Sequence, residues 1–316
     1  MIEVKNLSKH FGEKVAVDNI SFTVEKGEVL GFLGPNGAGK STTMRMVTGY
    51  LPPSAGDISV GGADILDEEI AAKSKIGYLP ENAPLYSDMT VEDFLRFCAE
   101  MRRVPTDQIE DAVNKAIDTC FLQRVRHQSV DTLSKGFRHR TCLAQSIIHD
   151  PEVLILDEPT DGLDPNQKHE VRNLIKRMGE TKAIIFSTHI LEEVEASCSR
   201  AIIIDRGKII ADGTPDQLKK KARNAGAIFL RAGGLASTGI RQELEKLPEV
   251  QSVNVLESGD NSIVARVIPN KGKDKELPEA IFQLAVTKGL KVHELRVEEG
   301  RLDELFREIT RPDTED

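Results

Sequence analysis

The chain has 316 residues, 39% of them hydrophobic and 29% charged, which is typical of a globular protein and, at about 100–200 residues per domain, of two domains. Its formal net charge of −9 argues against a nucleic-acid-binding protein, because a phosphate backbone is bound by clustered Lys and Arg. No run of about 18 apolar residues is present, and Met1–Asn6 lacks the basic-then-apolar layout of a signal peptide, so a cytoplasmic protein without a membrane-spanning segment is predicted.

The chain begins with two stretches that alternate apolar and polar residues. Ile2–Lys5 and Val15–Val24 are predicted to be antiparallel strands, since this alternation is typical of half-buried strands. Between them, Lys9–Gly12 is expected to form a turn that presents one aromatic side chain, Phe11.

A glycine-rich loop then joins an apolar segment typical of a buried strand, Glu28–Leu33, to a predicted helix, Ser41–Tyr50. The loop fits Gly-x-x-x-x-Gly-Lys-Ser, in which the lysine reaches the β- and γ-phosphates of a nucleotide and the serine hydroxyl binds Mg²⁺. Glycines let the backbone turn tightly, and its N–H groups, together with the helix N-terminus, attract anions. The nucleotide-binding residues predicted from this motif are Gly34, Pro35, Asn36, Gly37, Ala38, Gly39, Lys40, Ser41 and Thr42.

Two other interpretations of this loop are weaker. A glycine-rich turn without a ligand does not explain why Lys40 and Ser41 stand in register between a strand and a helix. A dinucleotide-binding fingerprint would place its third glycine where Thr42 stands, so that pattern fails. Phosphate binding is therefore the prediction.

A helical insert is predicted inside an α/β framework. Strands are expected near Ile58–Val60 and at Ile76–Glu81, the second running into a loop. The capping box Thr90–Asp93 and the pair Thr106–Asp107 each begin a helix, and Leu133–Phe137 leads into a further helix that begins with Arg138. The insert therefore covers residues 90 to about 150.

Two almost continuously apolar strands follow, and each ends in polar side chains. Val153–Glu158 ends in two carboxylates, and Ala183–His189 ends in a histidine. Such strands, alternating with helices, indicate a parallel sheet covered on both faces, with ligands bound at the carboxyl ends of its strands. Ala201–Ile210 is predicted to close this first domain, residues 1–220, as a hairpin.

The two carboxylates, Asp157 and Glu158, are the second chemical feature. A carboxylate at the end of a buried strand can hold Mg²⁺, usually through water, close to bound phosphates. The adjacent Glu158 is placed to orient a water in line with the γ-phosphorus. The alternative is that both acids are merely exposed at the end of the strand. The segment Pro159–Asp164 that follows them makes this alternative weaker.

Residues 221–316 are predicted to form a second, smaller domain. Strands and helices are expected in the order β-α-β-β-α-β, which indicates an α+β ferredoxin-like fold, and Arg301–Ile309 adds a terminal helix. Residues 221–316 contain no set of residues typical of a catalytic site, so an accessory or regulatory role is expected for this domain.

Six motifs in this order resemble those of the ATP-binding subunit of an ATP-binding cassette (ABC) transporter. They imply a phosphate-loop nucleoside triphosphatase fold, a mixed and mainly parallel sheet with an antiparallel β-subdomain and a helical insert. The resemblance covers residues 1 to about 215. The motifs are the phosphate loop, the glutamine-loop position at Glu81, the signature Leu133–Phe137, the acidic strand Val153–Glu158, the dimer loop Asp161–Asp164 and the switch histidine His189.

The resemblance also implies that ATP is hydrolysed between two head-to-tail copies of the chain. Phe11 would stack on adenine, and Glu158 and His189 would be catalytic. The residues that would hold Mg²⁺ are Ser41, Glu81 and Asp157. The second copy would contribute Ser134, Lys135, Gly136 and Asp164.

Three positions depart from the family pattern. Glu81 stands where glutamine is usual, so it keeps a metal-binding oxygen but donates no hydrogen bond. The usual signature is Leu-Ser-Gly-Gly-Gln, in which Lys135 and Phe137 replace a glycine and the glutamine. Phe11 stands where tyrosine is common. None of these changes removes an indispensable group, so ATP hydrolysis is predicted.

Tyr78–Glu81, the signature and Leu302–Phe306 resemble a branch of stand-alone ATPase subunits of bacterial multidrug, polysaccharide and gliding-motility type exporters. That branch implies a homodimer on the inner face of the cell membrane. Its partner would be a separate membrane permease that touches the helical insert and residues 82–93. A soluble ABC ATPase that acts in DNA repair or on the ribosome is disfavoured, because the insert is short and each motif appears once. A nucleotide-gated scaffold with weak hydrolysis stays open, since Glu81 and Phe137 depart from the pattern.

Overall fold

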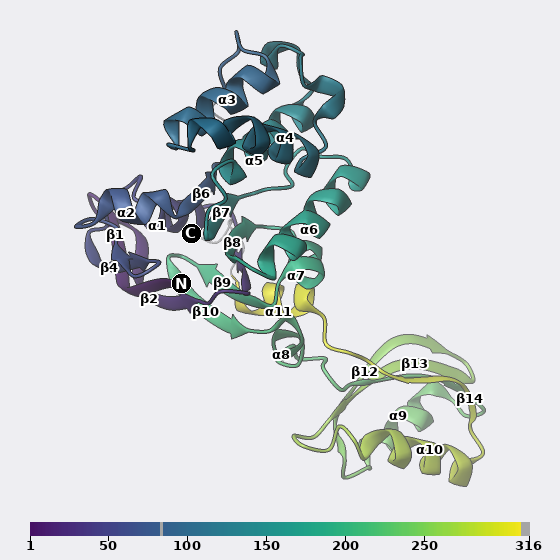
Figure 1. The fold of residues 1–316 in the computed structure, drawn as a ribbon. Coiled ribbons are helices and arrows are strands. Elements are labelled where there is room, and N and C mark those ends of the chain that lie inside the picture. The colour runs from purple at the N-terminus through teal and green to yellow at the C-terminus, as the bar shows by residue number, and fades with distance from the viewer. Residues whose placement is uncertain (83–84, 311–316) are drawn as a thin grey trace. The chain divides into compact units, whose positions relative to one another are not determined.

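The computed structural model describes residues 1–82 and 85–310, which form two compact units (Figure 1). Met1–Pro215 forms the first unit, to which Thr310 also belongs, and Asp216–Ile309 forms the second. The boundary predicted after residue 220 lies slightly beyond this division. Residues 311–316 of the predicted C-terminal domain, and residues 83–84 of the predicted permease-contacting loop, lie outside the described part of the chain.

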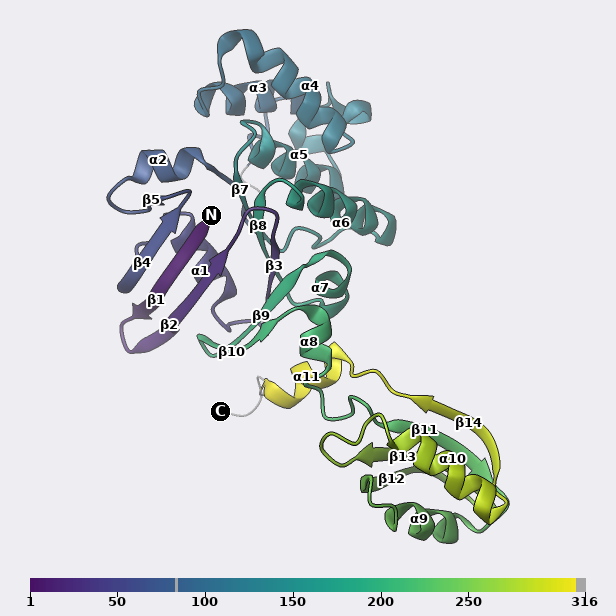
Figure 2. The ribbon, with the colours of Figure 1, turned by 60° about the horizontal axis from the view of Figure 1, so that its bottom comes forward.

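A six-stranded sheet with the strand order β10-β9-β3-β8-β7-β6 runs through the first unit (Figure 2). Its strands are parallel except β10, which pairs antiparallel with β9. Every residue of β3, β7 and β8 is buried, which explains their continuous apolar sequences. The strands are β3 (Val29–Leu33), β6 (Ile76–Leu79), β7 (Val153–Asp157), β8 (Ala183–Thr188), β9 (Arg200–Asp205) and β10 (Lys208–Gly213).

Two hydrophobic cores lie on opposite faces of this sheet. Leu154 and Leu156 of β7 belong to the core that includes the helical insert, whereas Val153 and Ile155 belong to the core that includes the phosphate-loop helix and the antiparallel sheet. Because successive side chains of a strand point to opposite faces, Asp157 follows Val153 and Ile155 toward the phosphate-loop side. The apolar pattern of β7 therefore determines where its terminal carboxylate lies.

A second sheet in the same unit is antiparallel, with the strand order β2-β1-β4-β5. The turn predicted at Lys9–Gly12 is wrong in part, because β1 continues through Phe11 and the turn begins at Gly12, where φ is +59°. Phe11 pairs with Lys14 across this hairpin. The strands are β1 (Ile2–Phe11), β2 (Lys14–Val24), β4 (Ala55–Val60) and β5 (Ala63–Asp64).

Helices fill the remainder of the first unit. In the insert, the Thr90 hydroxyl accepts a hydrogen bond from the Asp93 N–H at 3.1 Å, as the capping box predicts. The helix after the signature begins at Lys135 and not at Arg138, so most of the signature forms its N-terminus. No helix within residues 1–82 and 85–310 is long and apolar enough to cross a membrane. The helices are α1 (Lys40–Val47), α2 (Glu69–Ser74), α3 (Val91–Met101), α4 (Ile109–Thr119), α5 (Lys135–Ile147), α6 (Pro165–Gly179) and α7 (Leu191–Ser197), with short 3₁₀ turns at Thr106–Gln108, Gln123–Val125 and Val130–Thr132.

The second unit has the predicted ferredoxin-like order of elements. Its four strands form an antiparallel sheet, β12-β13-β11-β14, and α9 and α10 contribute Ile240, Leu244, Leu277 and Ile281 to its core. α8 (Pro215–Lys219) lies at the division between the units, and α11 (Leu302–Ile309) follows the last strand. The remaining elements are β11 (Ile228–Gly233), α9 (Ser237–Glu245), β12 (Val250–Gly259), β13 (Ser262–Pro269), α10 (Leu277–Lys288) and β14 (Lys291–Val297).

Candidate active site

The phosphate loop connects β3 to α1, and two of its glycines have backbone conformations that other residues rarely adopt. Gly37 has a φ of +78° and Gly39 a φ of +108°. A Cβ atom on Gly39 would lie 2.6 Å from the backbone oxygen of Ala16, so a larger residue has neither the conformation nor the space there. α1 begins directly after Gly39, and its first N–H groups therefore point toward the loop.

Lys40 is almost completely buried, with 6% of its surface exposed. Its Nζ atom donates hydrogen bonds to the backbone oxygens of Gly34 at 2.7 Å and Pro35 at 3.1 Å. The ammonium group is thus held over the loop by the residues that begin it. This arrangement places a positive charge inside the loop, where an anion would bind.

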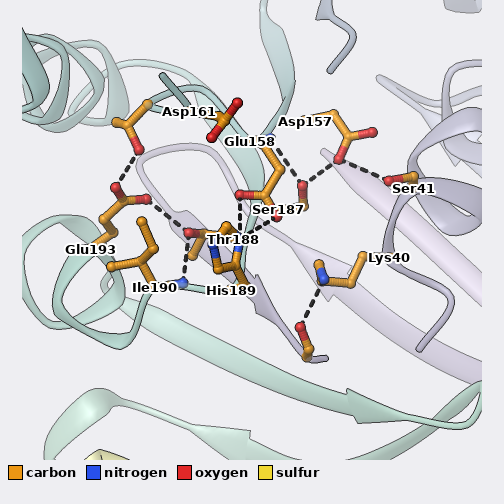
Figure 3. A network of polar contacts seen from close by, with 12 residues as sticks. Lys40, Ser41, Asp157, Glu158, Asp161, Ser187, Thr188, His189, Ile190 and Glu193 are labelled. Atoms are coloured by element: carbon orange, nitrogen blue, oxygen red, sulfur yellow. Dashed lines mark hydrogen bonds and ion pairs between the residues drawn. The ribbon is translucent and has the colours of Figure 1, made fainter. Parts of the chain in front are cut away.

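Asp157 connects the end of β7 to the phosphate loop (Figure 3). It is 1% exposed, and its Oδ1 atom accepts hydrogen bonds from the Ser41 hydroxyl at 3.2 Å and from the Ser187 hydroxyl. Its Oδ2 atom is buried and has no hydrogen-bond partner among the described residues. A buried carboxylate oxygen without a partner is unfavourable, which indicates that a further group completes this site.

A hydrated Mg²⁺ ion fits this oxygen, because carboxylate, hydroxyl and water oxygens are its preferred ligands. The described residues contain no group of three or more His, Cys, Asp or Glu that could hold a metal ion. Such an ion would therefore need phosphate oxygens or waters in addition to Ser41 and Asp157, as is usual for Mg²⁺ at nucleotide sites.

Glu158 and His189 approach each other from the ends of neighbouring strands. The Nδ1 atom of His189 lies 3.1 Å from both carboxylate oxygens of Glu158 (Figure 3). Glu158 has a φ of +52°, a strained conformation for a residue other than glycine, and its N–H donates to the backbone oxygen and the hydroxyl of Ser187. Burial raises the pKa of Glu158, while the hydrogen bond from His189 opposes that shift. The strained backbone directs the carboxylate toward the histidine.

A cavity of about 410 Å³ lies over the phosphate loop. Glu81 and Glu158 reach it from the sheet side, and Phe11 reaches it from the end of β1 with 51% of its surface exposed. The cavity therefore brings together most of the residues predicted for nucleotide and metal binding. Its lining residues are Phe11, Lys14, Ala16, Asn36, Gly37, Gly39, Lys40, Ser41, Thr42, Glu81 and Glu158.

The residues predicted to act from a second copy do not line this cavity in the described chain. Ser134 caps α5, because its hydroxyl accepts a hydrogen bond from the Phe137 N–H at 3.4 Å. Lys135 forms an ion pair with Asp161 of its own dimer loop at 2.9 Å. Asp164 caps α6 by accepting from the Gln167 N–H at 2.9 Å, and Gly136 is buried where a Cβ atom would meet the Gln167 side chain.

The family model described as ABC transporter matches residues 17–161. The linearmycin resistance ATP-binding protein LnrL of Bacillus subtilis (strain 168) is 32% identical over 98% of this chain and 98% of its own length. The chain belongs to the ATP-binding proteins of ABC transporters. It is therefore an ATPase.

Two further relatives of this ABC ATP-binding protein support the assignment over its first unit. The Nod factor export ATP-binding protein I of Sinorhizobium fredii (strain NBRC 101917 / NGR234) is 39% identical over 69% of the chain and 64% of its own length. A solved ATP-binding subunit of an ABC transporter is 29% identical, covers 70% of the chain and 92% of its own length, and superposes with a TM-score of 0.65. The predicted family and cassette fold are thus confirmed.

Three residues of this ABC ATP-binding protein lie at the site although no motif indicated them. Lys14 and Ala16 line the cavity beside Phe11 because the β1–β2 hairpin brings them there. Ser187 contacts both Asp157 and Glu158 because β7 and β8 are neighbours in the sheet. The sequence contained one signal for Ser187, which is a hydroxyl residue two positions before the switch histidine. Its hydrogen-bond partners, however, are evident only from the pairing of β7 with β8.

Proposed function

We propose that two copies of this chain bind two Mg-ATP head to tail and use their hydrolysis to drive export through a separate membrane permease. The protein would then be cytoplasmic and held at the inner face of the cell membrane by that permease. The observation on which this rests is the cavity over the phosphate loop, which gathers Lys40, Ser41 and Glu158 but lacks the signature residues.

The residues predicted for nucleotide and metal binding have roles that follow from their positions. The phosphate loop and Lys40 bind the triphosphate, and Phe11 offers an exposed ring for the adenine. Ser41 and Asp157 would hold Mg²⁺ with Glu81 at the cavity wall, and the ion would neutralise charge on the phosphates.

Glu158 and His189 perform the catalytic work. The Glu158 carboxylate accepts a hydrogen bond from the attacking water and orients it, which a raised pKa assists because the carboxylate is then a stronger base. His189, whose half-exposed side chain contacts that carboxylate, would bind the γ-phosphate.

The second copy would complete the site with the N-terminus of α5. Ser134 uses its oxygen to accept the capping hydrogen bond, so its O–H remains able to donate to a phosphate. The start of a helix also attracts negative charge. Gly136 and Lys135 lie in the first turn of α5, and Asp164 is the N-cap of α6, so all three stand at helix N-termini.

Export is supported by what the relatives are called. One is a linearmycin resistance protein and another a Nod factor export protein, and the first matches this chain over almost its full length. The described residues of the ferredoxin-like second unit contain no group of three or more His, Cys, Asp or Glu that could hold a metal ion, and we assign this unit an accessory or regulatory role.

The replacement Glu158→Gln tests the catalytic assignment. It keeps the shape of the side chain but removes its basicity, so ATP turnover should fall by about 10²–10³-fold while ATP binding is retained. Glu192→Gln, at an exposed position of α7, is the matched control and should be as active as the wild type. Equal, negligible turnover in wild type and Glu158→Gln would instead indicate a nucleotide-gated scaffold.

The partner is tested by purifying the full chain from membranes. Co-purification with a multi-span membrane protein is expected. Recovery only with ribosomes or DNA would overturn the transporter assignment and favour a soluble ABC ATPase.

A further inference from the structure

Glu193 is a buried carboxylate with no role in the mechanism above. It lies on α7 with 1% of its surface exposed. Burying a charged group is costly unless hydrogen bonds or opposite charges compensate, so its partners show what this position is used for.

Two threonine hydroxyls hold this carboxylate. Thr188 donates to Oε2 at 2.8 Å, and Thr160 donates to Oε1 (Figure 3 labels Thr188 and Glu193). Lys168 and Arg172 of α6 approach the same carboxylate at 3.9 and 3.6 Å, so they balance its charge from a greater distance. The short, direct hydrogen bonds thus go to the threonines.

These threonines belong to the two segments that carry the catalytic residues. Thr160 lies two residues after Glu158 and directly before the dimer loop, and Thr188 directly precedes His189. Both are buried, at 3% and 0% exposure. The Thr188 hydroxyl also accepts a hydrogen bond from the Ile190 N–H at 3.0 Å, which fixes the backbone on the far side of His189.

We propose that Glu193 is a positioning residue that holds the Glu158 segment and the His189 segment at the separation their contact requires. Each oxygen of one carboxylate is bonded to one segment, so the carboxylate sets the distance between them. Through Thr160 the same group is connected to the dimer loop, where the second copy would dock. This inference rests on the catalytic roles proposed for Glu158 and His189.

The alternative is a buried ion pair that only stabilises the packing of α6 against α7. In that case the cations would be the principal partners, and the hydroxyls could be replaced at no cost to turnover. The two hypotheses therefore differ in whether turnover needs the threonine hydroxyl groups.

The test uses the full-length protein and four variants with steady-state ATP turnover as the readout. Glu193→Gln should lower kcat by about tenfold to a hundredfold, as loss of hydrogen bonds to a charged group does, with the KM for ATP within about twofold of wild type. Glu192→Gln on the same helix should change neither constant. Thr188→Val should behave like Glu193→Gln, whereas Thr188→Ser, which keeps the hydroxyl, should restore most of kcat.

The possible failures are distinguishable. Wild-type kcat in Glu193→Gln, with Glu158→Gln inactive, would overturn the positioning role and leave the proposed function intact. Activity in Glu158→Gln equal to that of wild type would overturn the proposed function itself. Equal kcat in Thr188→Val and Thr188→Ser would also overturn the inference, and this pair decides the matter if Glu193→Gln does not fold.

Discussion

Ser187 is fully buried near the end of β8, where it contacts both Asp157, the last residue of β7, and Glu158, which follows it. Its hydroxyl donates to Asp157 Oδ1 and accepts from the Glu158 N–H at 3.1 Å. The Ser187 hydroxyl therefore occupies one oxygen of Asp157, and the other oxygen, Oδ2, is the one that a water of the proposed Mg²⁺ ion would use. The same hydroxyl also supports the strained backbone of Glu158, which has a φ of +52°.

Replacing Ser187 by Ala should weaken Mg²⁺ use more than ATP binding. Without the hydroxyl, Asp157 loses a hydrogen bond that orients its carboxylate, and we expect kcat to fall by about tenfold with a higher Mg²⁺ concentration needed for half-maximal rate. Titrating MgCl₂ at fixed ATP measures both. Ser146→Ala removes an equally buried hydroxyl on α5 that donates to the Leu143 backbone oxygen, and it should leave the Mg²⁺ dependence unchanged. Identical Mg²⁺ curves for wild type and Ser187→Ala would contradict this role.

The sequence predicts contiguous site residues better than those assembled by pairing. The phosphate loop is a local motif whose glycine conformations and helix start depend on adjacent residues, so it could be recognised directly. Asp157, Glu158 and His189 were also accessible, because an apolar strand that ends in polar residues indicates a ligand edge. Ser187 and Glu193 could not be found in this way. Asp157 lies 30 residues from Ser187 and Thr160 lies 33 residues from Glu193, so these pairs meet only after the chain folds.

Two of the helix N-caps are also residues that we propose contact the nucleotide of the second copy. Ser134 begins α5 and Asp164 begins α6, and both also belong to motifs assigned to the second copy. The prediction that the signature helix starts at Arg138 was wrong because the cap was not recognised: Ser134 bonds to the Phe137 N–H and thereby places Lys135–Phe137 in the helix. The turn predicted at Lys9 was wrong for a related reason, since strand pairing carries β1 as far as Phe11.

Asp164→Ala should lower the free energy of unfolding by about 1 kcal/mol, because α6 loses the side chain that accepts from the Gln167 N–H. Asp164→Asn keeps a capping oxygen and should retain most of that stability. Urea unfolding of the two variants beside wild type gives the comparison. If Asn costs as much as Ala, the negative charge and not the cap is responsible.

The order of elements along the chain predicts the class of fold in each unit. Alternating apolar strands and helices require parallel pairing with crossovers, and the β-α-β-β-α-β order allows few antiparallel arrangements. The exact division between the units was less predictable, because α8 is a short helix that continues directly from the hairpin of β9 and β10.

Stability against acid should depend on His149, which follows α5 and joins the insert to the central sheet. Its Nε2 atom lies 3.1 Å from the Ile76 backbone oxygen, and burial, with Arg102 and Lys182 nearby, lowers its pKa to about 4. The unfolded chain binds a proton there near pH 6.5, so between about pH 6.5 and 4 it holds more protons than the folded chain. The free energy of unfolding should therefore fall as the pH drops through that range.

His149→Gln should reduce this loss of stability, since glutamine does not titrate and can still donate to Ile76. Urea unfolding at pH 7.5 and pH 5 should show a smaller difference for the variant than for wild type. Burial also lowers the pKa of His139, so part of the dependence should remain. His169→Gln, at an exposed position of α6, is the control and should retain the wild-type difference. If the difference between pH 7.5 and pH 5 is the same in His149→Gln as in wild type, this partly buried imidazole does not link folding to pH.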